Sequence, residues 1–250
     1  MTAIPYCDKS WNLTAGCSMV NAGCTHCWGC QMAARMAANA LGGYENVVKD
    51  GKWTGQVNLR PCNLSKPLYW KKPHRIFVCS MSDIFHERIP KDYIDRIFSM
   101  MVATPRHSYL LFTKRYERAV NILANHALLS NIWIVFSVSN QEIADFARPY
   151  LNQIASWGWN TGVSYEPALG AVDWGGWEFI KWMVCGGESG SKRRPFDIAW
   201  MQDAYLWAQL RDIPFYAKQD SAFKPGQQGR ISDFLWGIKE VVPLPKEQNA

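Results

Sequence analysis

The sequence of 250 residues lacks an apolar run long enough to span a membrane. Its continuous apolar runs, such as residues 132–136, have the length of a strand. It also lacks the charged and apolar leader segment that is typical of secreted proteins. We therefore expect a soluble, cytoplasmic protein that has no membrane partner.

Cysteine is too infrequent for a small disulfide-stabilised scaffold, since the chain has only eight cysteines. With no secretory leader, we expect these thiols to be reduced. Hydrophobic residues make up 48% of the chain and charged residues 19%, which is ordinary for a globular enzyme. The length is sufficient for one barrel-sized domain with a large core.

Four of the eight cysteines lie close together, at Cys17, Cys24, Cys27 and Cys30. Soft thiolates grouped in this way are typical of iron–sulfur sites, and the glycines between them let the backbone fold around a cluster. A 4Fe-4S cluster held by three cysteines has one iron without a protein ligand, and chemistry can take place there. The sequence therefore predicts a metallocluster enzyme.

Two other metal sites remain open at this point. Structural zinc takes four tetrahedral ligands, usually from two separated knuckles, and the remaining four cysteines form no second CxxC pair. A zinc site that adds Cys30 or His26 to the other three cysteines is one alternative. The other is a ferredoxin-like CxxCxxC spacing over Cys24, Cys27 and Cys30, as in an electron carrier.

From residue 75 onward, short apolar runs alternate with amphipathic segments of helix length. Apolar runs this continuous are typical of strands covered on both faces. The sequence therefore predicts an α/β fold, a partial or full (β/α) TIM-like barrel of six to seven parallel strands, with the cysteine loop after the first strand. An open doubly wound sheet is the alternative. The predicted strands are 76–80, 108–113, 132–138, 161–165, 180–185 and 214–218, and the predicted helices are 91–103, 116–126, 141–156 and 197–211.

Polar side chains follow each of these six predicted strands. In β/α barrels the working groups come from the C-terminal ends of the strands and the loops after them, so we expect these side chains to converge on a site. Helix capping is the alternative for any single Ser, Asn or Asp. The candidates are Ser80, Ser82, Asp83, Lys114, Arg115, Ser137, Ser139, Asn140, Glu166, Glu188 and Lys218.

The cysteine pattern followed by a β/α array resembles the radical S-adenosylmethionine (radical SAM) superfamily. The phrases MSDIFHE, LLFTKR, SVSNQ, YEPALG, CGGESG and YAKQ resemble a phage-associated branch of it. The resemblance extends from about residue 11 to 220. The superfamily's usual motif is CxxxCxxC, whereas six residues separate Cys17 from Cys24 here.

The resemblance implies a 4Fe-4S cluster and S-adenosylmethionine as cofactors. It implies that His26 lies against the adenine. The cluster ligands would be Cys17, Cys24 and Cys27. The further cofactor-binding residues would be Ser80, Ser82, Asp83, Ser137, Ser139 and Asn140. The groups that position the substrate or move a proton would be Glu166, Glu188, Lys114 and Lys218, together with Arg115.

The reaction implied by the resemblance is reductive cleavage of S-adenosylmethionine to a 5′-deoxyadenosyl radical, which abstracts a substrate hydrogen. An external flavodoxin- or ferredoxin-type donor would supply the electron. The substrate would be a modified nucleobase, nucleotide or DNA, for instance in an isomerase step of phage thymidine hypermodification. A zinc- or cluster-containing nucleic-acid-binding protein without radical chemistry is the alternative function.

Residues 1–220 are expected to form the barrel, and residues 221–250 an extension that packs on it. The long segment 42–74 inside the barrel region interleaves basic and aromatic residues and includes Lys71 and Lys72. Together with the net charge of +6, this composition favours a lid that binds phosphate and stacks a base. An ordinary covering loop is the alternative.

Overall fold

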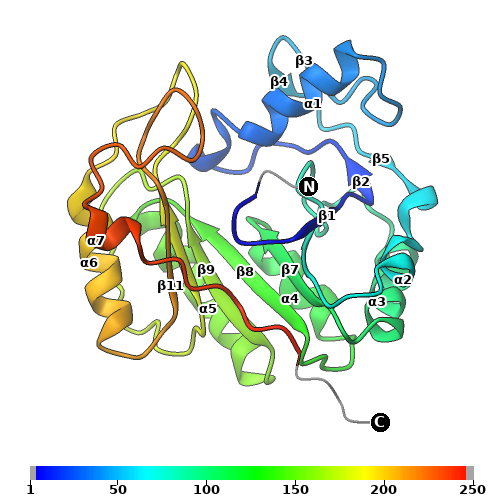
Figure 1. Ribbon diagram of the computed structural model, residues 1–250. Coiled ribbons are helices and arrows are strands. Elements are labelled where there is room, and N and C mark those ends of the chain that lie inside the picture. The colour runs from blue at the N-terminus through cyan, green and yellow to red at the C-terminus, as the bar shows by residue number, and fades with distance from the viewer. Residues whose placement is uncertain (1–3, 246–250) are drawn as a thin grey trace.

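The computed structural model describes residues 4–245 and contains a seven-stranded parallel sheet that curls into a half-barrel (Figure 1). All six pairs of neighbouring strands are parallel. The predicted partial β/α barrel is therefore confirmed. In spatial order the strands are β1 (Lys9–Trp11), β6 (Arg75–Val78), β7 (Ser108–Thr113), β8 (Ile132–Val138), β9 (Asn160–Tyr165), β10 (Met183–Gly186) and β11 (Phe215–Gln219).

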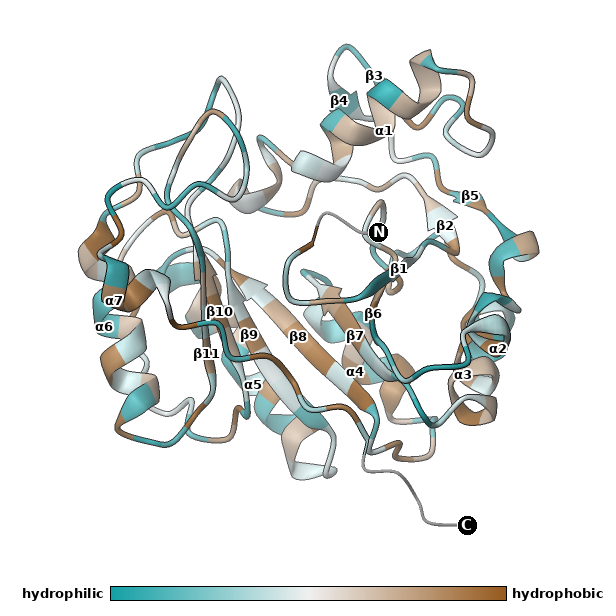
Figure 2. Cartoon of the chain, in the orientation of Figure 1, coloured by the Kyte–Doolittle hydropathy of each residue, from teal (hydrophilic) through white to brown (hydrophobic). Residues whose placement is uncertain are grey.

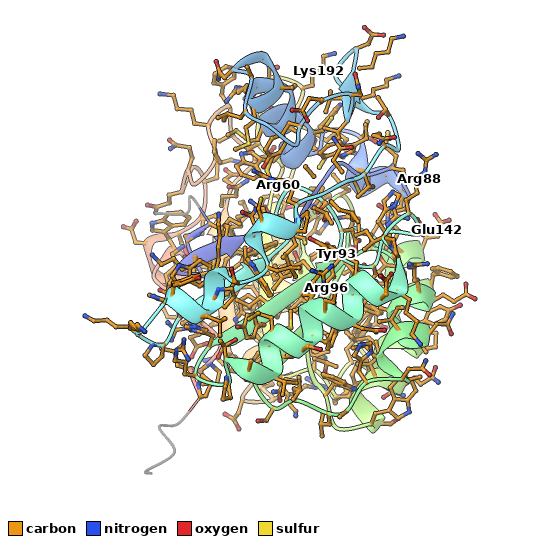
Figure 3. All side chains as sticks on the ribbon, turned by 90° about the vertical axis from the view of Figure 1, so that its right-hand side faces the viewer. Arg60, Arg88, Tyr93, Arg96, Glu142 and Lys192 are labelled. Atoms are coloured by element: carbon orange, nitrogen blue, oxygen red, sulfur yellow. The ribbon has the colours of Figure 1, made fainter. Side chains whose placement is uncertain are left out.

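Four helices follow strands in the order that the sequence predicts, and they cover the outer side of the sheet (Figure 1). Each buries an apolar side; α3, for example, buries Tyr93, Ile97 and Met101. Figure 3 views the molecule from the side of α3, with Tyr93 and Arg96 labelled. Within residues 4–245, no helix combines the length and apolar character needed to cross a bilayer. The four helices are α3 (Lys91–Ala103), α4 (Tyr116–Leu123), α5 (Gln141–Ser156) and α6 (Ile198–Gln209).

The concave side of the sheet is covered by the chain's own ends. The Tyr6 ring lies 5.5 Å from the rings of Trp182 and Tyr216 and stacks on Phe112 at 5.7 Å. The strands are therefore apolar on both faces, as the brown central strands of Figure 2 show, and all seven residues of β8 are buried.

A C-terminal strap, residues 238–243, crosses the open side of the half-barrel near the beginning of the strands (Figure 1). The Glu240 backbone carbonyl accepts a hydrogen bond from Trp182 Nε1 at 2.9 Å, and the Val242 carbonyl accepts one from Arg75 Nε at 2.6 Å. The strap follows the one-turn helix α7 (Asp233–Trp236). The described part of the 221–250 extension thus packs on the barrel. Residues 246–250 lie outside the described residues. The expected domain boundary at residue 220 stays a prediction.

The segment 42–74, expected as a long loop, contains short regular elements that are too brief to show a periodic pattern. One antiparallel hairpin lies above the sheet beside the helix that carries Cys30, and a second antiparallel pair joins the segment to the cysteine loop (Figure 1). The segment therefore packs against the cysteine loop. Its elements are β3 (Val48–Lys49), β4 (Lys52–Trp53), β5 (Asn58–Leu59), η2 (Pro61–Asn63) and α2 (Lys66–Tyr69), and those of the cysteine loop are β2 (Thr14–Ala15), η1 (Ala22–Cys24) and α1 (Trp28–Ala38).

The packing of Tyr6 inside the half-barrel gives a test of the fold. Tyr6→Ala should lower the free energy of unfolding by about 3–5 kcal/mol, because it leaves a cavity among large aromatic rings. Tyr6→Phe keeps the ring and should cost about 1 kcal/mol or less. Urea titrations followed by tryptophan fluorescence would measure both. Equal losses for the two variants would contradict the packing role of the ring.

Candidate active site

A cavity of about 500 Å³ opens at the C-terminal ends of the strands, beneath α1 and the cysteine loop. This volume lies within the usual range for ligand and cofactor sites, about 300–1,000 Å³. Most of the side chains expected at strand ends meet there, as barrel topology requires. The predicted residues in its wall are Cys17, Cys24, His26, Cys27, Ser80, Ser82, Asp83, Lys114, Arg115, Ser137, Glu166, Glu188 and Lys218.

Three of the four clustered thiols face this cavity, and the fourth does not. Cys17, Cys24 and Cys27 are free cysteines in the cavity wall. Cys30 lies on α1, is buried outside the cavity wall, and donates a hydrogen bond to the Gly51 carbonyl at 3.5 Å. Burial raises the pKa of the Cys30 thiol to about 11. The arrangement therefore favours the wide Cys17–Cys24–Cys27 set over the ferredoxin-like spacing.

The three cavity thiols are the type of donor that an iron–sulfur cluster takes. Among residues 4–245, no three His, Cys, Asp or Glu side chains converge closely enough to hold one metal ion. In an iron–sulfur cluster each thiolate binds a different iron, so the sulfurs stand around the cluster and not about one point. The donor set thus fits a 4Fe-4S cluster.

The cysteine loop packs directly on the ends of β7 and β8. A Cβ atom at Gly23 would lie 2.7 Å from Ser139 Oγ and 3.3 Å from Lys114 Cε, so only glycine permits this approach. Asn21 begins η1 by accepting a hydrogen bond from the Gly23 amide at 3.0 Å. These contacts set Cys24 against the strand ends.

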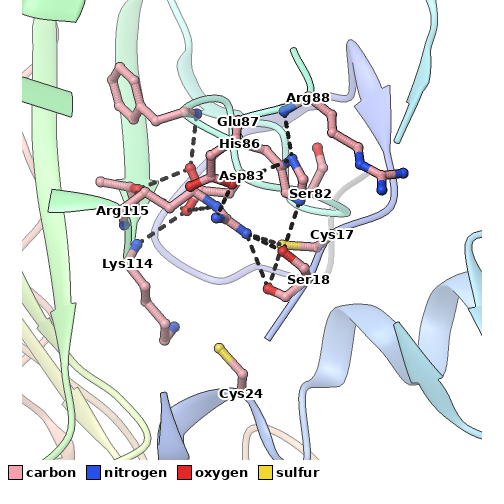
Figure 4. Close-up of polar contacts among 12 residues, drawn as sticks. Cys17, Ser18, Cys24, Ser82, Asp83, His86, Glu87, Arg88, Lys114 and Arg115 are labelled. Atoms are coloured by element: carbon pink, nitrogen blue, oxygen red, sulfur yellow. Dashed lines mark hydrogen bonds and ion pairs between the residues drawn. The ribbon is translucent and has the colours of Figure 1, made fainter. Parts of the chain in front are cut away.

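Arg115 connects the cysteine loop to the loop after β6 (Figure 4). Its buried guanidinium donates to Ser18 Oγ at 2.8 Å and to the Cys17 sulfur at 3.8 Å, and it forms an ion pair with Glu87. Burial, and then the charge of Asp83, raise the pKa of the Cys17 thiol to about 12, with Arg115 opposing them. Arg115 therefore positions Cys17, a role that its place after β7 in the sequence does not indicate.

His86 also binds Ser18, the residue that Arg115 contacts. The Arg88 amide donates to His86 Nδ1 at 3.1 Å, so Nε2 carries the proton and donates to Ser18 Oγ at 3.0 Å. Burial and the neighbouring Arg115 charge lower the pKa of His86 to about 4, which keeps the ring neutral. His86 lies in the phrase MSDIFHE, but the sequence alone indicates no role for it.

Asp83 lies in the cavity wall, but its oxygens are already engaged. It accepts hydrogen bonds from Thr113 Oγ1 at 2.8 and 2.9 Å, from the Lys114 amide at 3.2 Å and from the Phe85 amide at 2.9 Å. Burial raises its pKa, although Arg115 and these donors act in the opposite direction. The carboxylate thus fastens the loop after β6 to the end of β7.

The two serines of the same loop are also bonded to the cysteine-loop side. Ser80 Oγ donates to Asn12 Oδ1 at 3.0 Å, and Ser82 Oγ lies 2.5 Å from Thr14 Oγ1. Both line the cavity. Their role as direct ligands of a cofactor stays a prediction.

Glu188 and His26, predicted for separate roles, form one unit. His26 Nδ1 donates to Glu188 Oε2 at 2.9 Å, and Arg194 binds the same carboxylate through its guanidinium at 2.6 and 3.1 Å and its amide at 2.9 Å. Burial alone would raise the pKa of Glu188, but the bonds from Arg194 and His26 hold it below its usual value. An ionised, fully bonded carboxylate orients His26 and is poorly suited to proton transfer.

Lys218 and Glu166 form the second charged pair, at the ends of β11 and β9, the two neighbours of β10 in the sheet. Lys218 Nζ lies 2.5 Å from Glu166 Oε1 and 5.7 Å from the centre of the Tyr6 ring. Both side chains are partly exposed in the cavity. A proton shared between these groups could be delivered to a bound substrate.

Two predicted residues lie outside the cavity wall. Asn140 caps α5 by accepting a hydrogen bond from the Ile143 amide at 3.1 Å, so its alternative reading as a helix cap fits. Ser139 is buried beneath Gly23, and its hydroxyl has no hydrogen-bond partner among the described residues.

Lys71 and Lys72 precede β6, at the edge where strands begin. The structure does not bring them to the site.

The floor of the cavity is aromatic, and no local sequence pattern indicates it. Tyr6, Phe77 and Phe112 line it from the concave face, and Trp28 and Trp53 line it from the cysteine-loop side. Phe77 and Phe112 occupy strand positions whose direction depends on register. Tyr6 precedes the first strand and belongs to no periodic pattern.

The chain belongs to a protein family of unknown function, DUF5131. The family model matches residues 1–239 and so includes every helix and strand described above. No curated protein sequence matches the chain. Membership in DUF5131 therefore places the cysteine loop and the half-barrel in one family unit without assigning an activity.

Among solved structures, the DUF5131 chain is similar to spore photoproduct lyase. One lyase variant aligns with 71% of this chain and 55% of its own, at 12% identity and a TM-score of 0.44. A second variant, with bound AdoMet and dinucleoside spore photoproduct, aligns with 63% and 45% at 12% identity and a TM-score of 0.40. The chain thus spans about half the length of the lyase chains it matches. Scores this low carry no inference about activity, which must come from this chain's own residues.

The orientation of the four thiols gives a direct test. After anaerobic loading with iron and sulfide, Cys17→Ala, Cys24→Ala and Cys27→Ala should each lose the cluster, because each removes a cavity thiolate. Cys30→Ala should keep it and serves as the matched control. Iron and sulfide analysis with visible spectra would measure this. Loss with Cys30→Ala and retention with Cys17→Ala would instead support the ferredoxin-like spacing.

The depressed pKa of Glu188 predicts a pH-dependent contribution to stability. The carboxylate should stabilise the fold fully above about pH 4.3, the usual unfolded value, and this gain should vanish as the pH falls through the lower folded pKa. Urea midpoints of the wild type and Glu188→Gln should therefore converge in acid. Glu178→Gln, at an exposed pair with Arg211, is the control and should change little. A gap that widens in acid would contradict the assignment.

Proposed function

We propose that this protein is a radical SAM enzyme that acts on a substrate bound in the half-barrel cavity. The observation that carries the proposal is the set of three free thiols, Cys17, Cys24 and Cys27, in the wall of one cavity at the C-terminal strand ends, with Cys30 turned away. When bound there, a reduced 4Fe-4S cluster supplies the electron that cleaves S-adenosylmethionine to a 5′-deoxyadenosyl radical.

The chain's own residues would then perform the binding and positioning. Arg115 holds Cys17 in place and contributes positive charge beside its sulfur, which favours the reduced form of a bound cluster. His26, oriented by Glu188, presents its ring toward the cavity next to Cys27 and is the candidate to contact the adenine. The hydroxyls of Ser80 and Ser82 are the candidates for the polar groups of the cofactor.

The substrate would lie between the aromatic floor and the Lys218–Glu166 pair. Aromatic faces such as Tyr6 and Phe112 are suited to stacking on a planar base, and the lysine could hold a phosphate or supply a proton. A modified nucleobase, in a nucleotide or in DNA, fits this combination and the net charge of +6. An isomerase-type rearrangement of that base is the reaction we infer.

Cleavage of S-adenosylmethionine tests the central step. The cluster-loaded protein, reduced with dithionite, should release 5′-deoxyadenosine and methionine slowly without substrate. Cys30→Ala should do the same, and Cys24→Ala should not, because it lacks a ligand. Chromatography of the quenched reaction would measure the products. A fully loaded and reduced protein that leaves S-adenosylmethionine intact would overturn the proposal and favour a non-catalytic nucleic-acid-binding role.

A further inference from the structure

Two loops at the mouth of the cavity are joined into one unit, which we call the rim: residues 188–195 after β10 and residues 220–230 after β11. Ser221 Oγ donates to the carbonyls of Glu188 and Arg194 at 3.1 and 2.6 Å, and the Gly190 amide donates to Ala222 at 3.0 Å. A Cβ atom at Gly187 would lie 2.5 Å from the Ser221 nitrogen, so glycine is required for this approach. The rim is therefore a defined surface and not two independent loops.

The acidic side chains Glu188 and Asp220 of the rim are engaged in ion pairs within the rim. Glu188 is buried and bound by Arg194, and Asp220 is buried and bound by the Arg230 guanidinium at 2.7 and 2.9 Å. Asp197, which follows the first loop, caps α6 by accepting from the Ala199 amide at 2.9 Å. The negative charges thus hold the rim together and leave little to offset cations on its outer side.

The exposed side of the rim carries three cations and one large aromatic ring. Lys192, Arg193 and Lys224 are exposed, and none makes an ion pair within residues 4–245. Figure 3 shows Lys192 on the upper part of the molecule. Phe223 is 66% exposed beside Lys224. An exposed phenylalanine among unpaired cations is the combination that binds single-stranded nucleic acid, by stacking bases and attracting phosphates.

The rim is also part of the cavity wall, through Glu188, Ser189, Pro225 and Gly226. We propose that the rim binds a nucleic-acid strand, with Phe223 stacked on a base and Lys192, Arg193 and Lys224 on phosphates, so that the substrate base enters the cavity as part of a strand and not as a free nucleotide. This inference deepens the proposed function, because the entry of the base into the cavity rests on that function. Binding of a strand to the rim itself does not require turnover.

Strand binding can be measured on the cluster-loaded full chain by fluorescence anisotropy with a labelled 12-residue oligothymidine and an abasic strand of equal length. Lys192→Ala/Arg193→Ala/Lys224→Ala should weaken binding at least tenfold and reduce the slope of log affinity against log salt by about 2. Phe223→Ala should weaken oligothymidine binding about tenfold and leave the abasic strand unaffected. Lys71→Ala/Lys72→Ala, on the opposite edge of the sheet, is the matched control with unchanged binding.

The outcomes separate this inference from the proposed function. Equal losses for the rim and control variants, competition by polyglutamate as strong as by DNA, or no binding by the wild type would overturn the rim assignment. Strand binding without cleavage of S-adenosylmethionine would leave the rim standing and remove the radical chemistry. Circular dichroism and thermal melting of each variant establish that the fold is retained.

Discussion

The buried carboxylate of Asp83 is the contact on which the geometry of the site depends. It ties its own loop, through the Phe85 amide, to the end of β7, through Thr113 and Lys114. It also faces Arg115, which reaches Ser18 and Cys17 of the cysteine loop. A buried charge that loses its partner is strongly destabilising, so neither group can be removed alone. These charged contacts act together with backbone hydrogen bonds, from the Gly16 amide to Met81 and from the Gly55 amide to the Cys17 carbonyl, to hold Cys17 over the strand ends.

The half-barrel provides the second constraint. A full ring of strands would bury its interior by itself, whereas this sheet is open and its inside is filled by Tyr6 and by the strap at Val242. These segments close the part of the concave face near the strand beginnings and confine the cavity to the strand ends. The site thus has an aromatic floor and polar walls. Such a site can hold a planar group while charged pairs act at its edge.

Charge is distributed in a way that matches this layout. Acids at the mouth are buried in pairs that fix loops, as with Glu188 and Arg194 or Asp220 and Arg230. Three cations that make no ion pair within residues 4–245, Lys192, Arg193 and Lys224, stand on the exposed rim. None of the basic residues of segment 42–74 lines the cavity.

The sequence by itself determined the order of strands and helices, because continuous apolar runs and helical periodicity are local patterns. Two predicted strands and two predicted helices have identical bounds in the structure: 108–113, 132–138, 91–103 and 141–156. It also placed most polar strand ends at one site, since parallel strands end at one edge. Only the tertiary structure decided which thiol turns away, that Glu188 orients His26, and that Tyr6 fills the interior. Those outcomes depend on contacts between residues far apart in the sequence, such as His26 with Glu188 and Tyr6 with Tyr216, and no local pattern encodes such contacts.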